Sequence, residues 1–209
     1  MPTLLQLDSS ADLTSSRTRA LTAAVADAWR GRGSAYQVVV RDLHVEQLPH
    51  LRTPAQHWPP RLRGTEIVPD DLDELQRSVL EELMAADVVV IGAPMYNYSM
   101  PSTLKAWVDL IHVPGVTAPF DEPTQPLAGR PVVIATARGA VYDPGTRTEN
   151  WDHVIPPLEL VLGEGLGMTV HVVATSRTLA DRVPDLGQVQ AHEEYQSALT
   201  QAAWLGANL

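Results

Sequence analysis

The chain has 209 residues, of which 44% are apolar and 19% charged, a balance typical of a globular protein with a sizeable core. Its net charge of −10 argues against a nucleic-acid surface, which requires clustered Lys and Arg, and the absence of cysteine excludes disulfides and thiol catalysis. No basic and apolar leader begins the sequence, and no apolar run approaches the ~20 residues of a membrane span. We therefore expect a cytoplasmic protein.

Five short segments rich in Val and Ile predict strands, and each is continuously apolar rather than alternating. This pattern is typical of parallel strands that are covered on both faces. The segments are Thr3–Leu7, Gln37–Val40, Val88–Ile91, Val132–Thr136 and Thr169–Val173.

Between the strands, apolar residues at three- and four-residue spacing predict helices, most clearly at Arg17–Arg30 and Asp70–Met84. Strands that alternate with helices indicate a doubly wound α/β sheet. We therefore expect one domain, residues 1–209, built as a five-stranded parallel sheet in three α/β/α layers.

The segment between the first strand and the first helix is rich in hydroxyl groups. A helix N-terminus exposes free N–H groups, so Ser10, Ser16, Arg17 and Thr18 are candidates to bind an anion there. A plain helix cap is the alternative interpretation. The turn contains neither a Walker A loop nor a Gly-x-Gly-x-x-Gly motif, which favours a monophosphate such as that of flavin mononucleotide (FMN).

Two further turns follow predicted strands and carry small or aromatic residues. The third strand leads into Gly92–Tyr98, where Asn97 stands between Tyr96 and Tyr98 and offers both a donor and an acceptor. The fourth leads into Arg138-Gly139-Ala140, where the glycine lets backbone N–H groups approach a ring edge. Together these turns indicate a ligand site at the carboxyl ends of neighbouring strands.

Two loops are unusually long, Leu43–Pro69 and Pro114–Gly129. Loops of this length in a compact domain are commonly functional or disordered. Trp58 in the first loop argues against plain disorder, and we expect it to pack on an oligomer partner or in a ligand cleft.

On these residues the chain resembles the FMN-dependent NAD(P)H azoreductase and quinone reductase family, whose fold is flavodoxin-like. The resemblance extends along nearly the whole chain. Its motifs are Ser10 with Ser16-Arg17-Thr18, Ala93–Asn97, Leu104-Lys105 with Asp109-Leu110, and Thr136–Gly139.

The resemblance implies bound FMN, with NADH or NADPH as co-substrate and a ping-pong two-electron reduction of quinones or azo compounds. It also implies a homodimer with FMN at the interface. The phosphate would contact Ser10, Ser16, Arg17 and Thr18; the ring and ribityl chain would contact Pro94, Met95, Tyr96, Asn97 and Tyr98; the pyrimidine edge would contact Ala137, Arg138, Gly139 and Ala140. Since the flavin performs the electron chemistry, no catalytic residue is required. Tyr142 is a candidate proton donor, with simple packing as its alternative role.

Departures from the family concern the acceptor side. Ala118 and the segment Leu162–Gly165 stand where family members commonly carry aromatics, and the candidate substrate pocket consists of Phe120, Trp58 and Tyr142. Two alternatives therefore remain: a specialised family member acting on a biosynthetic intermediate, and a non-enzymatic electron carrier. The seven histidines lack paired ligand spacing, so we expect no metal site.

Overall fold

The predicted Val-rich segments form one parallel sheet in the computed structural model, which describes residues 1–209. Its strand order is β2-β1-β3-β4-β5, and every neighbouring pair is parallel. The strands span Thr3–Asp8 (β1), Gln37–Asp42 (β2), Val88–Pro94 (β3), Pro131–Ala137 (β4) and Thr169–Thr175 (β5). The predicted three-layer fold class is confirmed.

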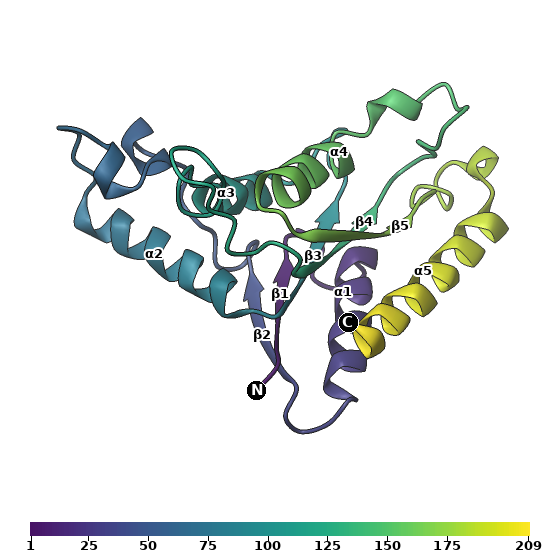
Figure 1. Ribbon diagram of the computed structural model, residues 1–209. Coiled ribbons are helices and arrows are strands. Elements are labelled where there is room, and N and C mark those ends of the chain that lie inside the picture. Colours follow the sequence, from purple (N-terminus) through teal and green to yellow (C-terminus); the bar gives the residue numbers. More distant parts are fainter.

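Helices follow the strands and cover both faces of the sheet (Figure 1). They span Arg17–Arg30 (α1), Asp70–Ala85 (α2), Ser102–Ile111 (α3), Ile155–Leu158 (α4) and Gln188–Asn208 (α5), and α4 continues as a π-helix, η4, over Glu159–Gly165. Single 3-10 turns lie at Pro54–His57 (η1), Pro60–Leu62 (η2), Glu149–Trp151 (η3) and Pro184–Leu186 (η5). None of the helices has the length and apolar character needed to span a bilayer.

Two apolar cores separate the layers. On one face α1 and α5 pack against the sheet, with Leu21 and Val25 fully buried beneath them. On the other face α2, α3 and α4 bury residues such as Leu83, Trp107 and Leu158. Figure 1 shows this division, with α1 and α5 together and α2, α3 and α4 across the sheet from them.

Burial differs between the central and the edge strands. Every residue of β3 is buried, because β3 lies between β1 and β4 and has helices on both faces. Strand β2 is an edge strand, and Val39 and Val40 are 41% and 53% exposed. The expectation that all five strands are covered on both faces is therefore wrong for both edge strands, since in β5 only Val173 and Thr175 are buried and the helices cover the edges of the sheet less completely than its centre.

The two long loops pack on each other beside α2 and α3. The ring centroids of Trp58 and Phe120 are 5.0 Å apart, and Arg61 donates to an Asp121 carboxylate oxygen at 3.0 Å. Arg61 also donates to the carbonyl of Gly115, whose φ of +76° is the left-handed region that favours glycine. Trp58 thus finds a packing partner within its own chain.

Close packing of α1 on α5 depends on Gly206. A methyl group at this position would lie 2.1 Å from the carbonyl oxygen of Val25 and 3.0 Å from Cβ of Ala28. We therefore expect Gly206→Ala to push the helices apart and lower the free energy of unfolding by about 2 kcal/mol in urea titration. Gly163→Ala is the control, because its methyl group meets Val170 at an ordinary 3.5 Å and should change stability little. Equal stability of the two variants would contradict the role of Gly206.

Candidate functional site

The N-terminus of α1 offers unpaired donors. Ser16 is the N-cap, and its hydroxyl accepts from the N–H of Arg19. The backbone N–H groups of Ser16, Arg17 and Thr18 donate to nothing in the protein, because the first turn of a helix has no internal acceptors. The Ser16 and Thr18 hydroxyls lie 3.0 Å apart, and the first turn carries no acidic residue. This helix end can therefore accept an anion.

The turn before α1 is closed by Asp12. Its carboxylate accepts from the N–H and hydroxyl groups of both Thr14 and Ser15, at distances of 2.7–3.1 Å. The hydrogen bonds from Ser15 hold the pKa of Asp12 well below its usual range. Ser10 is buried, and its hydroxyl accepts from the N–H of Asp12 at 3.3 Å. The turn is thus built around its own polar groups.

The side chain of Arg17 extends across the helix end towards β5 and α5. Its guanidinium donates to the Thr175 hydroxyl and to the carbonyls of Ser176 and Ala191, each at 3.4 Å, and lies over the ring of Tyr195. Three long hydrogen bonds leave the guanidinium weakly held. Arg17 therefore connects the start of α1 to the end of β5 and to α5 through contacts that a ligand could replace.

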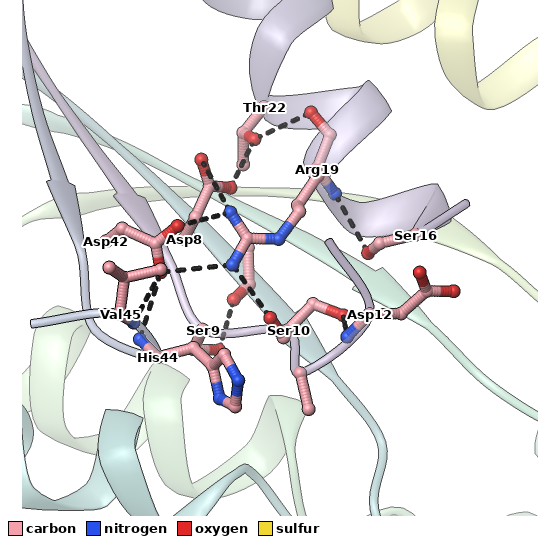
Figure 2. A network of polar contacts seen from close by, with 12 residues as sticks. Asp8, Ser9, Ser10, Asp12, Ser16, Arg19, Thr22, Asp42, His44 and Val45 are labelled. Atoms are coloured by element: carbon pink, nitrogen blue, oxygen red, sulfur yellow. Dashed lines mark hydrogen bonds and ion pairs between the residues drawn. The ribbon is translucent and has the colours of Figure 1, made fainter. Parts of the chain in front are cut away.

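Arg19, which the sequence analysis did not single out, is the centre of a polar network (Figure 2). Its guanidinium donates to both carboxylate oxygens of Asp42 at 2.6 and 3.0 Å and to the carbonyl of Ser10 at 2.7 Å. Asp42 also accepts from the N–H groups of His44 and Val45. Arg19 therefore connects the turn after β1 to the turn after β2.

Asp8 lies beneath this network. Burial raises the pKa of Asp8, while hydrogen bonds from Thr22 and Gln6 and the charge of Arg19 at 4.0 Å act in the opposite direction. For Asp42, burial is the largest single effect and acts to raise the pKa, but the hydrogen bonds from Arg19 and from two backbone N–H groups, with the charge of Arg19, together outweigh it and lower the pKa. Arg19 thus stabilises the charged form of both carboxylates, directly at Asp42 and, at Asp8, in addition to the hydrogen bonds from Thr22 and Gln6.

The turn after β3 places Tyr96 against the turn after β1. The Tyr96 hydroxyl accepts from the N–H of Ala11 at 3.0 Å and lies 3.3 Å from the Ser10 hydroxyl. Asn97 and Tyr98 adopt φ values of 49° and 71°, a conformation that few non-glycine residues adopt. The Asn97 amide is exposed and has no partner in the protein, so it can bind a ligand.

The turn after β4 is anchored by Arg138. Its side chain, 9% exposed, donates to the Ser176 hydroxyl at 2.8 Å and pairs with Asp143 and Asp152 at 3.0 and 3.5 Å. The next two backbone N–H groups, those of Gly139 and Ala140, have no acceptor. The anchored turn therefore presents two free donors, while the guanidinium itself is occupied elsewhere.

These turns follow strands that are adjacent in the sheet, and hydrogen bonds join them. The N–H of Met95 donates to the carbonyl of Ala137 at 3.0 Å, and Pro94, the last residue of β3, pairs with Ala137 in β4. Together with the Tyr96 contact, this brings the sequence-predicted cofactor residues of all three turns to one edge of the sheet.

The three residues predicted to line the substrate pocket do not lie together within one chain. Phe120 and Trp58 pack together on the long loops, whereas Tyr142 lies by the turn after β4, 5.8 Å from the Arg138 guanidinium. Burial raises the pKa of Tyr142, and the neighbouring Tyr98 adds to this effect. Within one chain, Tyr142 is thus a partner of Tyr98 and Arg138 rather than of Trp58.

The positions of the free hydrogen-bond donors on these turns indicate which kind of ligand could bind there. Free N–H groups at 16–18 and 139–140 match a phosphate and the polar edge of a ring, and the exposed Asn97 amide lies on the turn between them in the sheet. Nowhere do three or more His, Asp or Glu side chains gather as they would around a metal ion. The arrangement fits a mononucleotide with an aromatic ring.

The strand order 2-1-3-4-5, with free N–H groups at the N-terminus of α1 after the first strand, defines a flavodoxin-like α/β protein with a candidate mononucleotide site. A family described by its flavodoxin-like fold matches residues 2–199. An FMN-dependent NADH:quinone oxidoreductase of Kineococcus radiotolerans is 53% identical over the full length of both chains, and one of Frankia alni is 37% identical over 89% of each. The chain belongs to this family of FMN-dependent NADH:quinone oxidoreductases, which confirms the resemblance.

Solved structures support the same fold. An azoreductase from Bacillus anthracis has a TM-score of 0.84 at 20% identity and covers all of both chains. An FMN-dependent NADH-azoreductase of the same species, solved in complex with FMN, has a TM-score of 0.78 at 20% identity and covers all of both chains.

We expect Arg19→Met to lower the free energy of unfolding by about 2 kcal/mol, because it leaves two partly buried carboxylates without their cation. Loss of that cation raises the pKa of Asp8 and Asp42 in the folded state, so ionising them costs stability as pH rises. The destabilisation relative to wild type should therefore be larger at pH 7 than at pH 4.5. Urea titrations at both pH values measure it.

Arg30→Met is the matched control for Arg19→Met. Arg30 forms an exposed pair with Asp27, and its loss should change stability by less than about 0.5 kcal/mol. A destabilisation by Arg19→Met that does not vary with pH would contradict the electrostatic role of Arg19.

Proposed function

We propose that this protein is an FMN-dependent NADH:quinone oxidoreductase that also accepts azo compounds. The observation that carries the proposal is the set of unpaired N–H groups on adjacent strand ends, at 16–18 and 139–140, with the Asn97 amide on the turn between them. Two relatives, 53% and 37% identical to this chain, are named FMN-dependent NADH:quinone oxidoreductases, which supports the quinone activity. Bound FMN would supply the two-electron chemistry between NADH and the acceptor.

The FMN phosphate is assigned to the N-terminus of α1. Backbone N–H groups of Ser16, Arg17 and Thr18 donate to it, the Ser16 and Thr18 hydroxyls complete the cradle, and Ser10 supports it from the preceding turn. The helix dipole adds to the attraction, as does the nearby Arg17 guanidinium.

The ring is assigned to the next two turns. Pro94–Tyr98 line it, and the Asn97 amide binds its polar edge. The free N–H groups of Gly139 and Ala140, in the turn Ala137–Ala140, would hold the pyrimidine edge and favour negative charge there.

We also propose that residues 1–209 form a single domain and that the protein is a cytoplasmic homodimer with FMN at its interface. The support for a dimer is apolar surface on the loops beside α2: Phe120 is 62% exposed and Ile67 is 86% exposed. A cytoplasmic location agrees with the use of NADH and with the absence of cysteine.

The direct test is whether purified protein binds FMN, is bleached by NADH and regains its colour with a quinone. Failure to turn over any quinone or azo dye, despite FMN binding, would favour the electron-carrier alternative.

Ser16→Asp separates the cofactor site from the helix cap. Aspartate is as good an N-cap as serine, so the melting temperature of the apo-protein should be unchanged. Its charge repels phosphate, so the Kd for FMN, measured by fluorescence quenching, should rise at least about 30-fold. Ser34→Asp adds the same charge at an exposed position ahead of β2 and should bind FMN as wild type does. Unchanged FMN binding by Ser16→Asp would exclude the N-terminus of α1 as the phosphate site.

Tyr142 is assigned as a proton donor to the reduced acceptor. Its hydroxyl is protonated throughout the neutral range, as in an ordinary tyrosine, and burial raises its pKa further. Tyr142→Phe should slow reoxidation of the reduced enzyme by a quinone about tenfold at pH 8 and less at pH 6, where solvent supplies protons. Reduction by NADH should not change. Stopped-flow absorbance measures both steps, with Tyr36→Phe as control; a pH-independent deficit would indicate a packing role instead.

A further inference from the structure

We propose that Tyr98 and Trp151 form a subsite for a planar two-ring quinone next to the residues assigned to the flavin ring. This inference rests on the proposed function and names where its acceptor binds.

The subsite is an open hollow of about 470 Å³ lined by Asn97, Tyr98, Trp151 and His153. The Tyr98 and Trp151 ring centroids are 5.7 Å apart and their planes meet at 89°. Two perpendicular aromatic walls form a corner, in which a flat ring can stack on one wall and contact the other edge-on. The volume lies in the range of small-molecule sites.

Exposure distinguishes this pair from aromatic residues of the core. Tyr98 is 49% exposed and Trp151 is 40% exposed, although each already packs on the other. Large aromatic surface that remains accessible at the mouth of a polar hollow is suited to a flat apolar ligand. Asn97 and His153 supply hydrogen-bonding groups for the oxygen atoms of such a ligand.

The position of Trp151 is fixed by its neighbour Asp152. One Asp152 oxygen accepts from the N–H groups of Val154 and Ile155, which caps the start of α4, and the other pairs with buried Arg138 at 3.5 Å. The N–H of His153 donates to the carbonyl of Tyr98 at 2.9 Å, so both walls are connected through the backbone. The subsite is therefore held in shape before any ligand arrives.

Its location connects it to the proposed chemistry. Asn97 lines the hollow and is also assigned to the flavin ring, so an occupant would lie next to that ring. Tyr142 lies close enough to Tyr98 and Asp152 for both to influence its pKa. An acceptor in this hollow would therefore have a protonated hydroxyl within its surroundings.

The hollow also accounts for the aromatics missing elsewhere. Ala118 and Leu162 are buried, and the rest of the segment Leu162–Gly165, where an aromatic is also expected, consists of two glycines and an exposed glutamate. Trp151 comes instead from the loop between β4 and α4, and provides the aromatic surface that those positions lack.

The test uses FMN-loaded, oxidised protein and menadione, a two-ring quinone, without NADH. Isothermal titration calorimetry gives the Kd for menadione, and fluorescence gives the Kd for FMN. Trp151→Ala should weaken menadione binding about tenfold, Trp151→Phe less than about threefold, and neither should change FMN binding. Trp204→Ala, which removes a 61% exposed tryptophan from α5, is the matched control and should bind menadione as wild type does.

Two outcomes would overturn the inference: Trp151→Ala binds menadione within twofold of wild type, or it weakens FMN binding by the same factor. Failure of the proposed function is distinct, because wild-type protein would then fail to bind FMN or to be reduced by NADH. If wild type does both while Trp151→Ala keeps full menadione affinity, only the subsite is wrong.

Discussion

The parallel pairing of β3 between β1 and β4 is the constraint on which the site depends. Parallel strands end at the same edge of a sheet, so the turns after β1, β3 and β4 must meet there. Because β3 is buried throughout, its backbone is rigid up to Pro94, and the turn that follows departs from a fixed position. The free N–H groups at 16–18 and 139–140 are therefore placed by the sheet, with little freedom left to the loops.

Much of this arrangement follows from local sequence. Continuous Val-rich segments and the spacing in α1 and α2 sufficed to predict the strands, two helices and the three turns, because each signal lies within a few neighbouring residues. The exposure of β2 was not predicted, since whether a strand is at an edge depends on its partners in the sheet.

The parts of the site that escaped prediction depend on long-range contacts. In the sequence, Arg19 is indistinguishable from an ordinary helix residue. Its role depends on the contact with Asp42, which lies 23 positions away in the chain. Trp151 is similar: the sequence places it in a loop, and Tyr98 becomes its neighbour through the packing of Arg138 on Asp152. For Arg138, the expected donor to a ring edge is its backbone N–H, but in the structure this group donates to the carbonyl of Thr175 in β5 at 2.9 Å, and the free donors are those of Gly139 and Ala140.

The anchoring of the 141–153 loop by Arg138 has an evolutionary consequence. The loop is attached through charged and capping contacts at Asp143 and Asp152, and most residues between them are exposed. Substitutions there cost the core little, so selection can explore new acceptors without endangering the fold. Retention of the cofactor and choice of the acceptor thus become separable traits, which allows one ancestral scaffold to diversify in the molecules it reduces.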